Sequence, residues 1–274
     1  MPTDKLRPLF APDGRSVIVA LDHIVNGFDR GWEYPPAALD QIIAGRPDGL
    51  MTTYGVIKHY RERLAGQTAL ILRLDVGPTY LTDAWPDFSH WAPFYTVDDA
   101  LALGVDGVIV NLFVGGPVEL ETMRLAARVA ADCTRHGLPC AIEALPIKSS
   151  GVPNPMDADA VAYASRLAAE LGADLVKTYY TGDAASFERV TARCPVPVLV
   201  AGGPVIDSDL RLMEMVAGML AGGGRGLFIG RNAWQHRDPA AVLRAIGSIV
   251  HDGASAEEAA SELAAIIKLT TAAA

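Results

Sequence analysis

Residues 107–136 read GVIVNLFVGGPVELETMRLAARVAADCTRH and indicate the fold class of the chain. The first seven are apolar except for Asn111, whereas residues 117–136 have the apolar spacing of a helix. The first part predicts a buried strand and the second a long amphipathic helix. A strand that is apolar throughout, rather than alternating, is typical of a parallel sheet covered on both faces.

The same order of strand and helix repeats along the chain. Further short apolar runs predict strands, and a stretch with helical spacing follows each of them. The strands are expected at 16–21, 49–53, 68–74, 140–145, 175–178, 197–201 and 226–229, and the helices at 36–44, 55–64, from 97, and at 157–171, 182–193, 207–221 and 239–250. With residues 107–136, these make eight strand–helix units in about 250 residues, the count of an α/β fold of the (β/α)8 TIM-barrel type.

A doubly wound parallel sheet is the rival fold. It usually carries a glycine fingerprint after its first strand, but here that strand ends in Leu21-Asp22-His23. No Walker motif occurs either. We therefore expect one TIM-barrel domain over residues 1–274. Residues 255–268 add a C-terminal helix that packs on the barrel or on another subunit, with a capping box and an apolar face formed by Ser255, Glu258, Leu263, Ile266 and Ile267.

The balance of charges argues against several classes of partner. The chain has 23 Lys and Arg against 32 Asp and Glu, a formal net charge of −9 at pH 7. Nucleic acids and anionic membranes need a basic field, so we expect neither as a partner. No apolar run approaches about 18 residues, and the N-terminus lacks a signal-peptide pattern. The 3 cysteines have no metal-like spacing, so we expect a soluble cytoplasmic protein without a metal.

Polar residues at the carboxyl ends of barrel strands indicate chemistry, because the active site of this fold is built there. Asp22 and His23 end the first strand, Glu143 lies in the fifth, and Lys177 ends the sixth. Lys177 is the sharpest candidate, because it places an ammonium on an otherwise apolar strand. A buried lysine is either paired or neutral, and a neutral lysine attacks carbonyls to form a Schiff base. The alternative is a salt bridge to Asp22 or Glu143.

Two glycine-containing loops follow the last two strands, where TIM barrels form their phosphate sites. Gly202 and Gly203 supply backbone N–H groups after the seventh strand. Gly230 supplies more after the eighth, beside the guanidinium of Arg231. Such glycines are also common as simple turn formers. Both loops together, next to Lys177, predict a phosphorylated carbonyl compound as substrate.

At these residues the chain resembles the archaeal-type class I fructose-bisphosphate aldolases, within the Schiff-base aldolase superfamily that includes deoxyribose-phosphate aldolase. The matching stretches are VIVALDH at 17–23, GADLVKTYYTGD at 172–183, CPVPVLVAGGP at 194–204 and GRNAWQHRDP at 230–239. The resemblance implies that Lys177 forms the Schiff base, with Asp22 as a nearby acid. It implies no metal or other cofactor, a homo-oligomer, and a phosphate site at Gly202, Gly203, Gly230 and Arg231.

The chain departs from the family after the fifth strand. Many members carry Met-Tyr-Pro-Arg-Gly there, with the tyrosine as the proton-transfer group, but this chain has Leu145 and Ile147 in place of the tyrosine and the arginine. Glu143 projects on the same side as Leu145, and a carboxyl near an apolar wall has a raised pKa suited to proton transfer. The alternative is that Glu143 only pairs with Lys177 or Arg73.

Three further residues are candidates for the site. Tyr179 is a second possible proton donor, or merely packs. His23 and Arg73 join the expected substrate-binding set. An aromatic-rich loop at 75–95 is expected to form a satellite core, a lid or a subunit contact, and the SSGVPNP loop at 149–155 to close over substrate.

The leading hypothesis is a metal-independent class I aldolase acting on dihydroxyacetone phosphate or a phosphorylated ketose. Transaldolase activity is a close alternative. A thiolase-like acyl transfer on a phosphorylated diketone is another alternative. The thiolase of the phosphorylated autoinducer-2 signal also carries Lys-Thr-Tyr-Tyr at the Schiff-base position, and it also lacks the usual tyrosine after the fifth strand. A non-catalytic phosphosugar-binding protein is the third alternative, suggested by Leu145. The sequence names neither the acceptor aldehyde nor the oligomer size.

Overall fold

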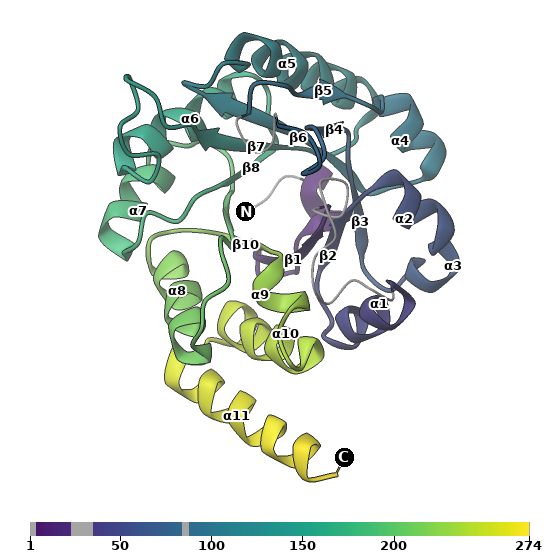
Figure 1. Ribbon diagram of the computed structural model, residues 1–274, viewed down its shortest axis with the longest axis vertical. Coiled ribbons are helices and arrows are strands. Elements are labelled where there is room, and N and C mark those ends of the chain that lie inside the picture. Colours follow the sequence, from purple (N-terminus) through teal and green to yellow (C-terminus); the bar gives the residue numbers. More distant parts are fainter. Residues whose placement is uncertain (1–3, 23–34, 84–87, 274) are drawn as a thin grey trace.

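A computed structural model describes residues 4–22, 35–83 and 88–273. In the described part of the chain, eight parallel strands close into a barrel in the order β1-β10-β9-β8-β7-β6-β3-β2. Figure 1 shows helices surrounding the barrel strands. The strands are β1 (Ser16–Leu21), β2 (Gly49–Thr52), β3 (Ala69–Arg73), β6 (Gly107–Val114), β7 (Cys140–Pro146), β8 (Leu175–Thr178), β9 (Val198–Ala201) and β10 (Gly226–Ile229). The predicted TIM barrel is confirmed.

The helices that cover the barrel follow the strands in sequence. Those after the first four barrel strands are α1 (Pro35–Ala44), α2 (Tyr54–His59), α3 (Arg61–Leu64), α4 (Val97–Leu103) and α5 (Glu119–His136). The rest are α6 (Ala158–Glu170), α7 (Ala184–Thr191), α8 (Asp209–Ala221), α9 (Arg231–Trp234), α10 (Pro239–Gly247) and α11 (Ala256–Ala273). Their apolar faces bury leucine, valine and alanine side chains against the strands. Burying one large aliphatic side chain stabilises a fold by roughly 1.5–3 kcal/mol.

The interior of the barrel holds a separate apolar layer. Its members come from alternate positions of the strands and are Ile18, Ala20, Met51, Ile71, Ile109, Ala141, Leu175, Leu199 and Phe228. The 3-10 helix η1 (Asp4–Leu9) contributes Leu6 and Leu9 to the same layer. Because strand side chains alternate, the residues two positions further along these strands also point inward, one layer nearer the carboxyl ends. Asp22, Arg73, Glu143 and Lys177 occupy such positions.

Several local predictions need correction. Residues 55–64 form two helices rather than one, because the backbone leaves the helix at Tyr60, with φ −115° and ψ 20°. The helix predicted at 239–250 is α-helical only as far as Gly247, and a π-helical turn over Ser248–Asp252 follows it. Helices η1 and α9 and a small hairpin of β4 (Asp75–Val76) and β5 (Ala92–Pro93) were not predicted. Each of these elements is too short to carry a periodic pattern.

The C-terminal helix α11 packs outside the barrel, against α8 and α10. Ser255 and Glu258 form the predicted capping box, because the Glu258 N–H donates to Ser255 Oγ and the Ser255 N–H donates to Glu258 Oε2. Leu263 and Ile267 are buried, as expected of the apolar face. Leu269 is 73% exposed, and Figure 1 shows this end of the helix pointing away from the barrel. The helix runs five residues beyond the predicted end, to Ala273.

No described helix has the length and apolar character needed to cross a bilayer. Within the same residues, no group of three or more His, Cys, Asp or Glu side chains is placed to hold a metal ion. Cys133, Cys140 and Cys194 are free and buried.

Candidate active site

Lys177 and Glu143 face each other across neighbouring strands inside the barrel. The two residues are paired in the register of β8 and β7. Lys177 Nζ donates to Glu143 Oε1 at 2.7 Å, and the two residues are only 5% and 8% exposed. A charge this deeply buried requires a partner, and each residue provides one for the other. The predicted alternative, a salt bridge between them, is therefore present, and it places a proton acceptor directly against the amine.

Arg73 joins this pair to two further carboxylates. Its Nε donates to Asp22 Oδ2 at 2.9 Å, one terminal nitrogen lies 3.4 Å from Asp75 Oδ1, and the other donates to Glu143. Burial lowers the pKa of Arg73, but the carboxylates of Glu143, Asp22 and Asp75 outweigh burial and raise it. Arg73 thus lies inside a network of two cations and three carboxylates. This position favours an electrostatic role for Arg73 over direct contact with a phosphate.

The pKa of Glu143 differs from the sequence expectation. Burial raises this pKa, as predicted for a carboxyl near an apolar wall, but the charges of Lys177 and Arg73 lower it by more than burial raises it. The net pKa lies below the ordinary value of the glutamate side chain. The expectation of a raised pKa was therefore wrong, because sequence reasoning did not bring Lys177 and Arg73 to the same carboxylate. Glu143 is a carboxylate in the resting state and can only accept a proton there.

Asp75 is a member of the network that sequence reasoning missed. It is fully buried and accepts hydrogen bonds from Trp91 Nε1 at 2.8 Å and from the Asn111 N–H at 2.7 Å. Burial raises its pKa despite the nearby Arg73. Its signal was present in the sequence, because Asp75 directly follows the apolar run predicted as a strand at 68–74.

Tyr179 lies one layer above Lys177, since it is two residues further along the chain. It is half-buried and packs against Leu145 and Phe113. Burial, followed by the charge of Glu143, raises the pKa of Tyr179 to about 12. The phenol therefore keeps its proton near neutral pH.

The two glycine loops lie side by side at the ends of β9 and β10. Asn232 joins them, because its Nδ2 donates to the carbonyls of Gly202 and Pro204 at 2.8 Å each, and its Oδ1 accepts from the Ile206 N–H at 2.7 Å. Gly203 has φ +66°, a conformation that favours glycine. Arg231 extends across the gap, with one guanidinium nitrogen 3.4 Å from the Gly203 carbonyl. The two loops predicted to form the phosphate site are therefore neighbours, and no sequence pattern indicates that Asn232 joins them.

The model of the family described as DeoC/LacD family aldolase matches residues 16–236. The chain belongs to this family. It is 33% identical to the class 1 fructose-bisphosphate aldolase of Thermoproteus tenax over 92% of this chain and 95% of that protein. It is 32% identical to a 2-amino-4,5-dihydroxy-6-oxo-7-(phosphonooxy)heptanoate synthase of Streptomyces griseus, over 88% of this chain and 86% of the synthase.

Solved structures of aldolases agree with this assignment. An archaeal fructose 1,6-bisphosphate aldolase superposes with a TM-score of 0.83 at 31% identity, over 92% of this chain and all (100%) of that one. Another, with its catalytic lysine covalently bound to the carbinolamine intermediate of the substrate, gives 0.81 at 30% identity, over 91% of this chain and 99% of that one. The predicted enzyme class is confirmed: the chain is a class I aldolase, the class that works through a lysine Schiff base.

In this aldolase the aromatic loop is largely a satellite core. Phe88 and Trp91 pack on Phe113, with ring centroids 5.0 and 4.8 Å away, and Tyr95 stacks on Tyr54 at 4.7 Å. Tyr80 and Phe94 are 50% and 64% exposed. His23, a candidate from the sequence, and residues 84–87 of the aromatic loop lie outside the described residues.

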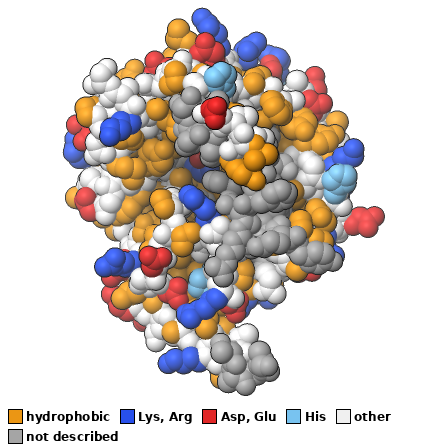
Figure 2. Space-filling model, in the orientation of Figure 1, with side chains coloured by type: hydrophobic (Ala, Val, Ile, Leu, Met, Phe, Trp, Pro, Cys, Tyr) orange, Lys and Arg blue, Asp and Glu red, His pale blue; other side chains and the backbone are white. Residues whose placement is uncertain are grey.

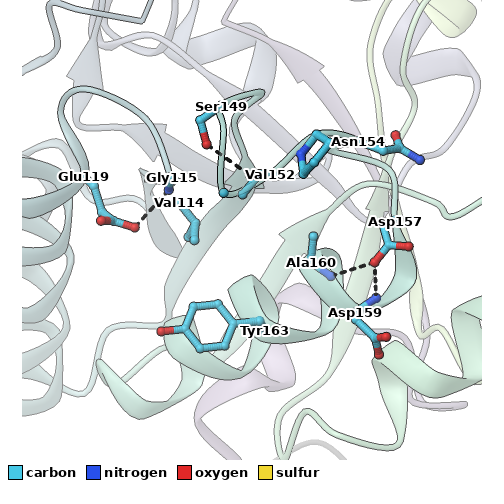
Figure 3. A pocket seen from close by; sticks show the side chains of 12 residues that line it. Val114, Gly115, Glu119, Ser149, Val152, Asn154, Asp157, Asp159, Ala160 and Tyr163 are labelled. Atoms are coloured by element: carbon cyan, nitrogen blue, oxygen red, sulfur yellow. Dashed lines mark hydrogen bonds between the residues drawn. The ribbon is translucent and has the colours of Figure 1, made fainter.

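The SSGVPNP loop lines a cavity of about 600 Å³ beside the barrel, shown in Figure 3. The other walls come from the end of β6 and from the first turns of α5 and α6, including Val114, Glu119 and Tyr163. Lys177, Glu143 and the glycine loops are not among the lining residues. The cavity is therefore separate from the charge network, and the expectation that this loop closes over substrate stays a prediction.

Proposed function

We propose that Lys177 is the Schiff-base nucleophile of this aldolase, that Glu143 transfers its protons, and that the donor substrate is a phosphorylated ketone such as dihydroxyacetone phosphate. The observation that carries the proposal is the 2.7 Å contact between Lys177 Nζ and Glu143 Oε1 inside the barrel. It gives a buried amine and a base within hydrogen-bond reach, which nucleophilic catalysis by lysine requires.

The first half of the reaction makes the iminium. The Lys177 ammonium passes one proton to the Glu143 carboxylate, and the neutral amine attacks the ketone carbon. The nitrogen proton then moves to the former carbonyl oxygen, which gives a carbinolamine. Glu143, now protonated, returns its proton to that hydroxyl, and water leaves. The iminium carries the positive charge that Lys177 carried at the start, so the charge of the network is restored.

The second half breaks or forms the carbon–carbon bond. In the cleavage direction, the Glu143 carboxylate takes the proton of the substrate hydroxyl, and the bonding electrons flow into the iminium to give an enamine and a free aldehyde. The same carboxyl then protonates the enamine carbon, and water hydrolyses the iminium. Tyr179, whose phenol keeps its proton, is proposed to donate a hydrogen bond to the oxygen of the aldehyde.

The phosphate is proposed to bind at the ends of β9 and β10. Backbone N–H groups of Gly203 and Gly230 and the guanidinium of Arg231 supply donors there, whereas the Gly202 N–H already donates to the Phe228 carbonyl at 2.9 Å. β9 is the neighbour of β8 in the barrel, so these loops lie next to the strand of Lys177. A net charge of −9 makes this local set of donors important, because the molecule as a whole repels an anion.

The proposal is tested by borohydride trapping, followed by intact-protein mass spectrometry. Wild type treated with dihydroxyacetone phosphate and borohydride should gain the mass of one reduced adduct, and Lys177→Ala should gain none. Lys177→Ala should also lose aldol activity by at least about a thousandfold. Equal labelling of the variant would show that another residue is the nucleophile, and no adduct on wild type would rule out this donor.

We propose three further properties of the protein: its location, its oligomeric state and its domain organisation. A cytoplasmic location is supported by the free, buried cysteines Cys133, Cys140 and Cys194, since oxidising compartments favour disulfides. A homo-oligomer is supported by the exposed Leu269 on the projecting end of α11. We also propose that residues 1–274 form one domain.

A further inference from the structure

The mouth of the barrel is divided into chemically different sides. On β6, β7 and β8, the positions Asn111, Glu143 and Lys177 are in register. The positions two residues further, nearer the mouth, are Phe113, Leu145 and Tyr179. These three pack together, and Ile147 and Trp91 pack with them. We call these five residues the apolar wall.

The apolar wall lies on the opposite side of Lys177 from the phosphate loops. The barrel order runs from β10 and β9, with the glycine loops, to β8 with Lys177, and then to β7 and β6. A donor held by its phosphate at Gly203 and Gly230, with its carbonyl at Lys177, therefore directs its reacting carbon towards β7 and β6. Figure 2 shows this face hollowed near its centre.

Little in the apolar wall suits a second charged group. Leu145 is only 8% exposed and Phe113 1%, and the phenol of Tyr179 is neutral near neutral pH. The cation one layer below, Arg73, already contacts three carboxylates. Lys148 is exposed and follows Ile147 in the loop. A phosphate or a row of hydroxyls against this wall would lose water without regaining its hydrogen bonds.

We propose that the acceptor aldehyde of this aldolase is apolar, with an alkyl or aryl chain and no phosphate. This inference rests on the proposed function, because it assumes that the donor is bound at Lys177 and the glycine loops. The half-buried members of the apolar wall, Trp91, Ile147 and Tyr179, then contact the carbon chain of the aldehyde. Each methylene group buried there raises the specificity constant by roughly 10-fold or more, the usual yield of an apolar pocket.

The test compares aldehydes with one donor. Wild type is given dihydroxyacetone phosphate, and kcat/KM is measured for phenylacetaldehyde, hexanal, propanal, D-glyceraldehyde and D-glyceraldehyde 3-phosphate. We expect hexanal and phenylacetaldehyde to exceed propanal and both glyceraldehydes by at least about 10-fold. A preference for glyceraldehyde 3-phosphate would overturn the inference. It would leave the proposed function intact, provided that borohydride still traps the donor on Lys177.

A matched pair of variants at Ile147 tests whether the preference for apolar aldehydes arises at the apolar wall. Ile147 is half-buried, so a longer side chain can extend towards the mouth. Ile147→Arg should lower kcat/KM for hexanal and raise it for glyceraldehyde 3-phosphate, shifting their ratio by roughly 100-fold, whereas Ile147→Met should keep the wild-type order. Borohydride trapping with dihydroxyacetone phosphate alone reports whether each variant is folded and binds donor. An unchanged ratio in an arginine variant that traps donor normally would count against the apolar wall as the acceptor site. Failure of wild type to trap the donor would remove the proposed donor and this inference with it.

Discussion

At the scale of single residues, the contacts of Glu143 are compatible with both roles considered from the sequence, proton transfer and ion pairing. It forms ion pairs with Lys177 and Arg73, and the same contact with Lys177 is the shortest route for a proton. Pairing does not exclude catalysis here, because the attacking amine must lose a proton to something within hydrogen-bond reach. Leu145, which replaces the tyrosine of many relatives, cannot serve in that role.

Replacement of Glu143 by glutamine separates the two roles. Glu143→Gln keeps the size of the side chain and an oxygen that can accept from Lys177, but it removes the base. We expect kcat to fall by about 10²–10⁴-fold, with slower formation of the trapped adduct. Single-turnover trapping measures the rate, and thermal unfolding measures the stability that the ion pairs contribute. A variant that is less stable but retains kcat within about threefold would assign Glu143 a purely structural role.

Which residues meet in the network could be predicted only in part. Lys177, Asp22 and Glu143 were identifiable because each places a charge at the end of, or within, an apolar strand. Asp75 met the same criterion and was missed. The contacts of Arg73 with three carboxylates depend on the relative register of β1, β3 and β7, which no local pattern encodes. The lowered pKa of Glu143 follows from those contacts and was equally beyond a local pattern.

At the scale of elements, the long-range order was predictable and the short elements were not. The bounds of β1 and β10 agree with prediction because each is an almost continuous apolar run followed by a polar residue or a glycine. Those of β8 agree as well, although Lys177 lies within that strand. Helix α9 has only 4 residues, yet its first turn carries Arg231 and Asn232. Its role comes from its position after β10, where it places Asn232 against the neighbouring loop.

The link between the two glycine loops can be tested at Asn232. Asn232→Ala removes three hydrogen bonds and should raise KM for dihydroxyacetone phosphate by about 10-fold, with kcat within about threefold, because the donors of the phosphate site lose their relative position. Unphosphorylated dihydroxyacetone is the matched control, and its KM should stay unchanged. Asn232→Asp keeps the acceptor for Ile206 but loses both donations and adds a negative charge, so its KM should rise further. Equal effects on both substrates would show that Asn232 acts on the barrel as a whole.

At the scale of the whole molecule, the two ends of the barrel use carboxylates differently. At the amino-terminal end, Asp48, Asp106 and Asp174 accept backbone N–H groups of Val17, Leu70 and Cys140 from the neighbouring strands, at 2.7–2.9 Å. Each of these aspartates directly precedes a strand. These aspartates accept hydrogen bonds from backbone N–H groups at the starts of the strands and so stabilise the fold. The carboxylates at the other end of the barrel surround Lys177 instead. Such a division is expected of a TIM barrel.

His251 links two aspartates at the amino-terminal end of the barrel and makes the stability of the fold depend on pH. Its Nδ1 lies 2.9 Å from Asp13 and its Nε2 3.0 Å from Asp48. The hydrogen bond with Asp48, opposed by burial and aided by Asp13, raises the pKa of His251 from 6.5 to about 9. A raised pKa means that the charged form stabilises the fold. This contribution is complete below about pH 6.5 and is lost as the pH rises through about 9.

The free energy of unfolding should therefore fall between pH 6.5 and about pH 9.5 by roughly 1–2 kcal/mol, less than the full shift implies because solvent screens a partly exposed pair. Urea unfolding at a series of pH values measures this fall. His251→Asn keeps a polar side chain that cannot titrate, so it should start less stable at pH 6.5 and lose little across the same window. A parallel fall in wild type and variant would mean that another group titrates in this window and that His251 is not the source.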